Sequence, residues 1–258
     1  MDSREIVKRT LNYDNPERVA RSFWGSDFAS CGNTVKTYAT GWKKVGGNRW
    51  ERTDEWGNVW ARLDATSKGE VVKGVLEDVE DYTDFEFPDF SNPDDYLTVK
   101  ECKQKHPDKW IIGGMPGFTF NIARKLFKLE NYLIKLMLET DKIHKLHDKI
   151  DDMLVDMIVN YAKAGVDSVM FPEDWGTQMQ LLINPKLWYE EFYPRFKRLC
   201  AVAHECGIKV FMHSCGAIGA IIPGLMEAGI DLLQFDQPTL HGIDTRSEGT
   251  RLNSSHPS

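Results

Sequence analysis

The hydrophobic pattern of the chain changes near residue 92. Before this point, short aromatic and β-branched runs are interrupted by Gly, Asp and Trp, whereas residues 92–245 alternate helix-length amphipathic segments with short, continuous apolar runs. Apolar residues three and four positions apart indicate helices, and continuous apolar runs are typical of strands buried on both faces. The pattern predicts one domain over residues 1–245, with an irregular N-terminal part (1–91) followed by regular strand–helix units (92–245).

The N-terminal part is expected to contain one helix and several short strands. Ser3 is a suitable N-cap for the helix. Two aromatic, β-prone runs flank Trp56-Gly57-Asn58, which is typical of a hairpin. The expected elements are a helix over 3–11, a strand over 18–24, a hairpin over 49–63, a strand over 69–76 and an acidic loop over 78–90.

The second part is predicted to alternate helices with strands. Gly165, Gly207 and Gly229 each follow a helical pattern and are suitable C-terminal stops. Strands separated by helices imply right-handed crossovers and a parallel sheet. Strands are expected over 110–114, 166–171, 208–213 and 230–235, and helices over 92–106, 118–138, 141–164, 184–206 and 217–228.

Two architectures suit such an alternation at this length: the (β/α)8 TIM barrel and the doubly wound open sheet. The open sheet often carries a nucleotide-binding motif, but no Gly-x-Gly-x-x-Gly follows the first expected strand and no Gly-x-x-x-x-Gly-Lys-Ser/Thr occurs. The predicted fold class is therefore α/β, with a TIM barrel favoured.

Residues 246–258 differ from the rest of the chain. The string RSEGTRLNSSHPS has no apolar periodicity and resembles a translated sequencing-library adapter. A polar C-terminal tail is the alternative interpretation. On the first interpretation residues 246–258 are not native, and the barrel is truncated after about Thr245, with about two strand–helix units missing.

Polar side chains gather where the four later strands are expected to end. The carboxyl ends of parallel strands carry the functional site in α/β folds. The segments at these ends are Met115-Pro116-Gly117-Phe118, Pro172-Glu173-Asp174-Trp175, His213-Ser214-Cys215 and Phe235-Asp236-Gln237-Pro238. The sequence predicts a functional site at this edge of the sheet.

His213 and Cys215 are the candidate metal ligands. Residues two apart in a strand point to the same side, so imidazole and thiolate can converge on one cation. Zinc accepts both ligand types, and a catalytic zinc needs about three protein ligands. Only two are visible here, and the alternative is a histidine that binds substrate beside a cysteine that packs.

The other candidates are carboxylates and neighbours at the same strand ends. Glu173 and Asp174 are adjacent, so one can enter the site while the other braces a loop; Glu173 is the candidate metal ligand, general base or partner of His213. The alternative for Asp174 is an N-cap. Asp236 is the second catalytic candidate, and the substrate-binding candidates are Asp27, Met115, Phe118, Trp175 and Gln237.

Composition narrows the classes of partner. The net charge is −7, from 32 basic and 39 acidic residues, and no basic block occurs, so neither nucleic acid nor an anionic membrane is expected as a partner. No apolar run is long enough for a transmembrane helix, and residues 1–5 do not begin a signal peptide. Five irregularly spaced cysteines fit a reduced protein. We expect a cytoplasmic protein with a small-molecule substrate.

Three segments resemble the uroporphyrinogen decarboxylase superfamily. They are GGMPGFTFNIARKL, EDWGTQMQLLINPKLWYEEFYPRFKRL and HSCGAIGAIIPGLMEAGIDLLQFDQP. The likeness covers residues 92–244 well and residues 3–90 loosely. It implies a (β/α)8 barrel in which IDLLQF is about the sixth strand.

The resemblance implies one of two chemistries. Uroporphyrinogen decarboxylases use no cofactor and bind a tetrapyrrole through a segment of the type Met-Arg-Gln-Ala-Gly-Arg and an Asp. Residues 18–27 lack that motif, and Arg21 is the nearest basic residue. Methylcobamide-dependent methyltransferases, such as the methylcobamide:coenzyme M enzymes, bind zinc through His-x-Cys and a distant Cys, and His213 and Cys215 match the first two positions.

The methyltransferase branch is the favoured interpretation. It implies a zinc-bound acceptor thiol that receives a methyl group from a methylated corrinoid on a partner protein, at a barrel mouth lined by Gly117, Glu173, Trp175 and Gln237. The third zinc ligand would lie in the missing C-terminal part. The alternatives are a cofactor-free decarboxylase of a tetrapyrrole or related acid, and an inactive fragment or binding-only member.

Overall fold

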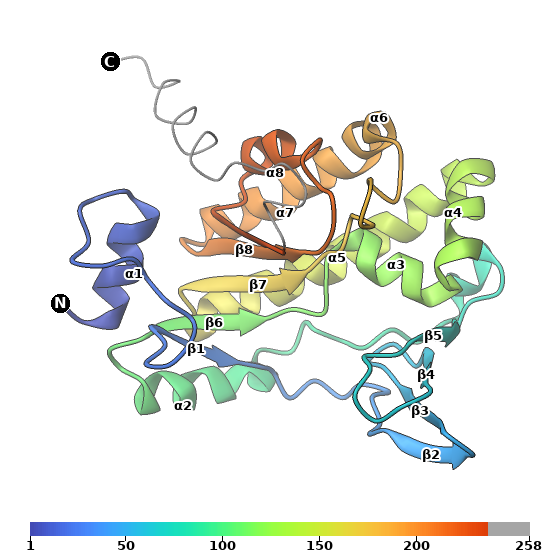
Figure 1. The fold of residues 1–258 in the computed structure, drawn as a ribbon, viewed down its shortest axis with the longest axis horizontal. Coiled ribbons are helices and arrows are strands. Elements are labelled where there is room, and N and C mark those ends of the chain that lie inside the picture. The colour runs from blue at the N-terminus through green and yellow to red at the C-terminus, as the bar shows by residue number, and fades with distance from the viewer. Residues whose placement is uncertain (237–258) are drawn as a thin grey trace.

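The computed structural model describes residues 1–236, which form two separate sheets and the helices that connect them (Figure 1). Gln237 and the tail over 246–258 lie outside the described residues. None of the described helices has both the length and the apolar character that crossing a membrane requires.

The larger sheet has five strands, all parallel, in the order β1-β6-β7-β8-β9. The sequence predicted four of these strands and the parallel sheet itself, and the α/β class is confirmed. The strands are β1 (Phe28–Cys31), β6 (Trp110–Gly114), β7 (Ser168–Pro172), β8 (Lys209–Ser214) and β9 (Leu232–Phe235).

Both faces of this sheet are apolar. One face packs against helices through residues such as Ile111, Val169 and Val210. The opposite face carries a smaller cluster of Trp110, Ile112 and Phe211, which Val7 of helix α1 (Ser3–Leu11) completes. The continuous apolar runs in the sequence therefore reflect burial on both sides of each strand.

The helices follow the predicted alternation. The expected helical region over 118–138 is two helices, which meet at Lys128, where φ is +69°. A three-residue α-helix and a π-helix precede α7, and the last helix begins five residues later than expected. The helices are α2 (Leu97–Lys105), α3 (Thr119–Phe127), α4 (Leu129–Leu138), α5 (Thr140–Ala164), α6 (Pro185–Leu187), η3 (Trp188–Phe192), α7 (Tyr193–Glu205) and α8 (Ile222–Ala228); two 3-10 helices, η1 (Val79–Thr83) and η2 (Pro93–Tyr96), precede α2.

The smaller sheet has four antiparallel strands in the order β2-β3-β4-β5. The predicted hairpin over 49–63 is confirmed as the pair of β3 (Arg49–Thr53) and β4 (Val59–Arg62), and the predicted strand over 69–76 is β5 (Glu70–Lys73); β2 (Lys43–Gly46) was not predicted. The sheet lies apart from the parallel sheet, on the side of α3 and α4 (Figure 1).

Two predictions about strands are wrong. The expected first strand over 18–24 is irregular, because its apolar side chains are exposed (Val19 72%, Phe23 70%, Trp24 94%) and give the segment nothing to pack against. The first strand of the parallel sheet is instead β1, whose Phe28 contacts Phe211. Within residues 1–236 β9 is the fifth strand of this sheet, whereas the family resemblance implied about the sixth.

The parallel sheet is open within residues 1–236, with β1 and β9 at its edges. A closed eight-stranded barrel is therefore not seen in the described part of the chain. The five parallel strands and their covering helices are nevertheless the arrangement that places the functional candidates.

Candidate functional site

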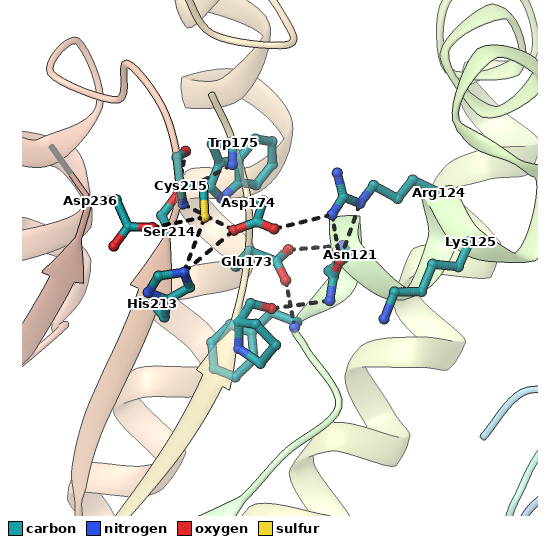
Figure 2. Close-up of polar contacts among 12 residues, drawn as sticks. Asn121, Arg124, Lys125, Glu173, Asp174, Trp175, His213, Ser214, Cys215 and Asp236 are labelled. Atoms are coloured by element: carbon teal, nitrogen blue, oxygen red, sulfur yellow. Dashed lines mark hydrogen bonds and ion pairs between the residues drawn. The ribbon is translucent and has the colours of Figure 1, made fainter. Parts of the chain in front are cut away.

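The strand pleat gathers three side chains beyond the ends of β7 and β8. His213 pairs with Pro172 on one side and Gln234 on the other. Continuing the alternation by two residues brings Asp174, Cys215 and Asp236 next to one another on the same face. Figure 2 shows Asp174 and Asp236 on either side of the His213–Cys215 pair.

The distances in this group are short enough for a shared ligand. Nε2 of His213 lies 3.2 Å from Sγ of Cys215 and 3.9 Å from Oδ1 of Asp174. One donor atom from each of Asp174, His213 and Cys215 lies within 4.8 Å of the other two. The Cys215 thiol donates to Oδ2 of Asp236 at 3.5 Å, and its backbone N–H donates to Oδ1 of Asp174 at 3.0 Å.

The electrostatics of the group suit a cation. Burial, with the carboxylates of Asp174 and Asp236 acting in the same direction, raises the pKa of the Cys215 thiol to about 12. Two carboxylates and a thiol thus share a small volume with one imidazole. Imidazole, thiolate and carboxylate are the ligand types of zinc sites, so these residues fit that metal.

Glu173 lies elsewhere, which corrects its prediction as a metal ligand or as a partner of His213. Its side chain is fully buried, and its carboxylate accepts N–H bonds from Phe118 at 2.7 Å and Asn121 at 3.0 Å. Burial raises the pKa of Glu173 to about 7, although these two N–H donors and the cations of Arg124 and Lys125 act in the opposite direction. Glu173 therefore braces the loop before α3.

The aromatic candidates are packed inside the molecule. Trp175 is fully buried and stacks on Phe120, with ring centroids 4.1 Å apart. Phe118 is fully buried against Phe171, and Met115 is 5% exposed. As substrate-binding residues, Met115, Phe118 and Trp175 are therefore corrected to core residues, because their strand phase points them at the helices.

Asp27 lies at the other end of the sheet. It precedes β1 instead of following a strand, and its backbone carbonyl accepts from the N–H of Trp110 at the start of β6. Its buried carboxylate forms two 2.6 Å bonds with Arg18, which lower its pKa. Asp27 was predicted to bind substrate because a strand was expected to end shortly before it. That reason is wrong, because Asp27 precedes β1.

Sequence reasoning did not assign three groups that the structure places at the site. Asp174, not Glu173, is the carboxylate beside His213, and Gln234 is the strand residue that pairs with His213. Strand alternation places Glu173 and Trp175 on the same side as the buried Val169 and Phe171, and Asp174 on the other side. Only the structure shows that the first of these sides carries the helices. Arg124 also reaches the site, with Nη2 3.9 Å from Oδ2 of Asp174.

The predicted pair of His213 and Cys215 is brought together, and Asp236 contacts it. Gln237 lies outside the described residues. Gly117 follows β6 with a positive φ of +144°. A Cβ at this position would lie 2.6 Å from the side-chain nitrogen Nδ2 of Asn121. Glycine thus permits the close approach of this loop to α3.

Solved structures share parts of this fold. A methyltransferase from Methanosarcina mazei matches with a TM-score of 0.52 at 18% identity, over 65% of this chain and 49% of the methyltransferase, so this chain spans about half of that protein's length. Two aldolases are less similar. They are QR15, an aldolase (TM-score 0.34, 12% identity, 62% of this chain and 53% of that one), and a catalytic lysine mutant of the Ruminococcus gnavus sialic acid aldolase (TM-score 0.30, 8% identity, 71% and 56%).

A search of curated proteins gave no match. A family model described as uroporphyrinogen decarboxylase (URO-D) matches residues 64–249. This range includes β5 to β9 and the site residues Asp174, His213, Cys215 and Asp236. The M. mazei methyltransferase shares the fold over 65% of the chain. The chain therefore belongs to the uroporphyrinogen decarboxylase (URO-D) family.

Proposed function

We propose that this chain is a zinc-dependent methyltransferase, which moves a methyl group between a corrinoid carried by a partner protein and a thiol acceptor. The observation that carries the proposal is the convergence of Asp174, His213 and Cys215, whose donor atoms lie within 4.8 Å of one another. Membership of the URO-D family and the fold shared with a methyltransferase support the same conclusion.

Three side chains would hold the metal. Asp174 offers a carboxylate oxygen, His213 offers Nε2 in its neutral form, and Cys215 offers Sγ after losing its proton. Zinc, when bound, supplies a Lewis acid that lowers the pKa of an acceptor thiol toward neutrality. Three protein ligands leave a position for such an acceptor.

The remaining residues orient the ligands and hold a proton. Oδ2 of Asp236 accepts the S–H of Cys215 at 3.5 Å and can take up its proton, which leaves Nε2 of His213, 3.2 Å from the same sulfur, to bind the metal. The Asp174 carboxylate is fixed by the backbone N–H of Cys215, which ties the ends of β7 and β8 together. Phe211, two residues before His213, packs on the same face of the sheet in the cluster that also contains Trp110.

Zinc binding by the purified full chain tests the proposal. The wild-type protein is expected to bind stoichiometric zinc and to give a thiolate–Co²⁺ absorption band when cobalt replaces it. His213→Ala and Cys215→Ser should abolish both signals. The matched control is Cys206→Ser, because Cys206 is exposed at the end of α7 and should leave both signals unchanged.

Activity is the second arm of the experiment. Methyl transfer from free methylcobalamin to a thiol should require zinc and should be lost in Cys215→Ser. A folded wild-type chain that binds no zinc would contradict the proposal and favour a cofactor-free decarboxylase. Zinc binding without methyl transfer, even with corrinoid proteins as donors, would favour a binding-only member.

A further inference from the structure

A cavity lies beside Asp174, between the antiparallel sheet and the helices α3 and α4. Its volume is about 420 Å³, and its walls come from β4 and β5 on one side and from α3 and α4 on the other. Asp174 lines its inner end. The cavity therefore reaches from the antiparallel sheet to a residue that also belongs to the His213–Cys215 group.

Two cations stand at the inner end of this cavity. The side chains of Arg124 and Lys125, on consecutive positions of α3, are only 18% and 14% exposed. In Figure 2 both extend from α3 on the side of Asp174 that faces away from Asp236. Burying two like charges side by side is unfavourable unless anionic groups compensate them.

In the described part of the chain, few anionic groups lie close enough to balance the charges of Arg124 and Lys125. Within residues 1–236, Lys125 Nζ makes no hydrogen bond, and its nearest carboxylate oxygen, from Glu55, is 3.8 Å away. Burial lowers the pKa of Lys125, with the Glu55 carboxylate acting against that shift. Arg124 donates from Nε and Nη2 to the neutral Asn121 side chain, and its carboxylate contact with Asp174 is 3.9 Å long. Nη1 of Arg124 has no hydrogen-bond partner among the described residues.

Charges at the rim are balanced differently. Lys68 and Lys128 line the rim together with Glu70 and Glu130. Lys128 and Glu130 form an ion pair at 3.3 Å, so this pair offers little net charge. Lys68 has no ion-pair partner among residues 1–236 but is exposed to water, so the buried positive charge that lacks a close partner is at Arg124 and Lys125.

Trp60 supplies an apolar wall that is held in place. Its indole N–H donates to Oδ2 of Asp54 at 2.7 Å, and Arg52 lies over its ring at 5.0 Å. Lys125 Nζ is 5.8 Å from the same ring. A ligand between Trp60 and α3 would thus meet an aromatic surface and two cations together.

We propose that this cavity binds an oxyanion group of a small molecule between Arg124 and Lys125, with Trp60 as its apolar wall. A carboxylate or phosphate group would take the free N–H groups of Arg124 and pair with the buried ammonium of Lys125. If Asp174 holds zinc, as proposed above, the rest of the molecule is directed toward the metal. Only this last clause rests on the proposed function.

Calorimetry on the zinc-free full chain tests the site. Acetate, succinate and inorganic phosphate are the probes, with acetamide as the neutral control. At least one anion should bind and raise the unfolding temperature, while acetamide should not. Whether the carboxylates or phosphate bind more tightly identifies the source of the oxyanion.

Variants separate this site from other surface charge. Arg124→Gln should weaken binding about tenfold, because it removes a charge-assisted donor pair. Lys128→Gln, the matched rim control, should change affinity less than about twofold. Anion binding beside Trp60 should also change the tryptophan fluorescence of the wild type. Trp60→Phe should remove this fluorescence change while calorimetry still detects binding. Arg124→Lys, which keeps the charge, serves if Arg124→Gln does not fold, and should restore part of the affinity.

The outcomes distinguish this inference from the proposed function. Equal affinity in wild type and Arg124→Gln, or no anion binding at millimolar concentration, would overturn the oxyanion site even if zinc binds. Anion binding that depends on Arg124 in a chain that never binds zinc would support the site and contradict the metal proposal.

Discussion

Glu173 and Asp174 are adjacent in the chain, yet their carboxylates lie on opposite sides of the extended backbone that follows β7. The carboxylate of Glu173 is buried against backbone N–H groups of Phe118 and Asn121, whereas Oδ1 of Asp174 lies 3.9 Å from Nε2 of His213 (Figure 2). The two residues therefore have separable roles, one in the stability of the loop before α3 and one in the metal group.

Asp174→Asn should weaken zinc binding without unfolding the protein. The amide keeps the size of the side chain but removes the negative charge that a cation requires. Because even outer partners of metal ligands contribute about 10- to 100-fold to affinity, we expect a loss of at least about tenfold. Competition with a chromophoric chelator measures it. An unchanged affinity in a folded variant would remove Asp174 from the ligand set.

Glu173→Gln should instead lower the free energy of unfolding. One of the two N–H donors would then face the amide NH2 group in place of an oxygen, and an unsatisfied buried donor costs about 1–3 kcal/mol. Chemical denaturation measures the loss. Glu190→Gln is the control, since Glu190 is mostly exposed (62%) on η3 and should alter stability by less than about 0.5 kcal/mol. A larger effect of Glu173→Gln on zinc affinity than on stability would argue that Glu173 binds the metal.

The strands of the second half were predictable because each is a short apolar run that ends at a clear boundary. The run WIIGG matches β6 residue for residue. Gly165 and Gly229 end α5 and α8 with φ values of +99° and +114°, where other residues are strained. Local sequence therefore determines these boundaries almost completely.

The face that each strand residue occupies was not predictable in the same way. Both faces of the parallel sheet are apolar, so the hydrophobic pattern does not reveal which side carries the helices. For this reason Glu173 and Trp175 were expected at the site although they point at the helices. Asp27 was misplaced because the strand was expected over 18–24, before Asp27 instead of after it.

A buried ion network between α5 and α7 should determine part of the pH dependence of stability. His147 Nδ1 and Arg195 Nε contact Oε1 of Glu191 at 2.6 and 2.7 Å. His147 is fully buried, whereas His144, which contacts Oε2 of Glu191 at 2.6 Å, is half-buried. Burial lowers the pKa of His147 from its usual 6.5, against the effect of Glu191. Burial acts to raise the pKa of Glu191, but its hydrogen bonds and charge interactions with His147 and Arg195 outweigh burial and lower the pKa.

The sign of the effect follows from these directions. Below about pH 6.5 the unfolded chain takes up a proton at His147 that the folded chain does not. The free energy of unfolding should therefore decrease as the pH is lowered below about 6.5. His147→Gln should flatten this slope between pH 6.5 and 5. Glu191→Ala should cost about 2–3 kcal/mol, because it removes the carboxylate from Nδ1 of the buried His147 and from Nε of Arg195, although Arg195 keeps Asp148 and Asp151 and His147 keeps Tyr132. His144→Ala removes the half-buried partner of Glu191, whose contact water screens, and should cost less than about 1 kcal/mol. Equal losses in the two variants would contradict a buried network.

The ion pair of Arg18 and Asp27 should stabilise the fold and leave the site unaffected. Asp27 is fully buried and accepts two 2.6 Å bonds from Arg18, which is 34% exposed. Arg18→Ala should cost about 2 kcal/mol, less than for a fully buried pair because water reaches the guanidinium. Since the pKa of Asp27 is lowered by Arg18, the stability from this pair is present above about pH 4 and is lost as the pH falls.

A comparison of Arg18→Ala with Asp27→Asn separates structure from substrate binding. If Asp27 only anchors the segment before β1, both variants should unfold more easily, and their combined effect should be smaller than the sum of the two. Their zinc affinity and the KM for the acceptor should equal those of the wild type, because Asp27 lies at the end of the sheet opposite to His213. A rise in KM for Asp27→Asn without a loss of stability would place Asp27 at the substrate after all.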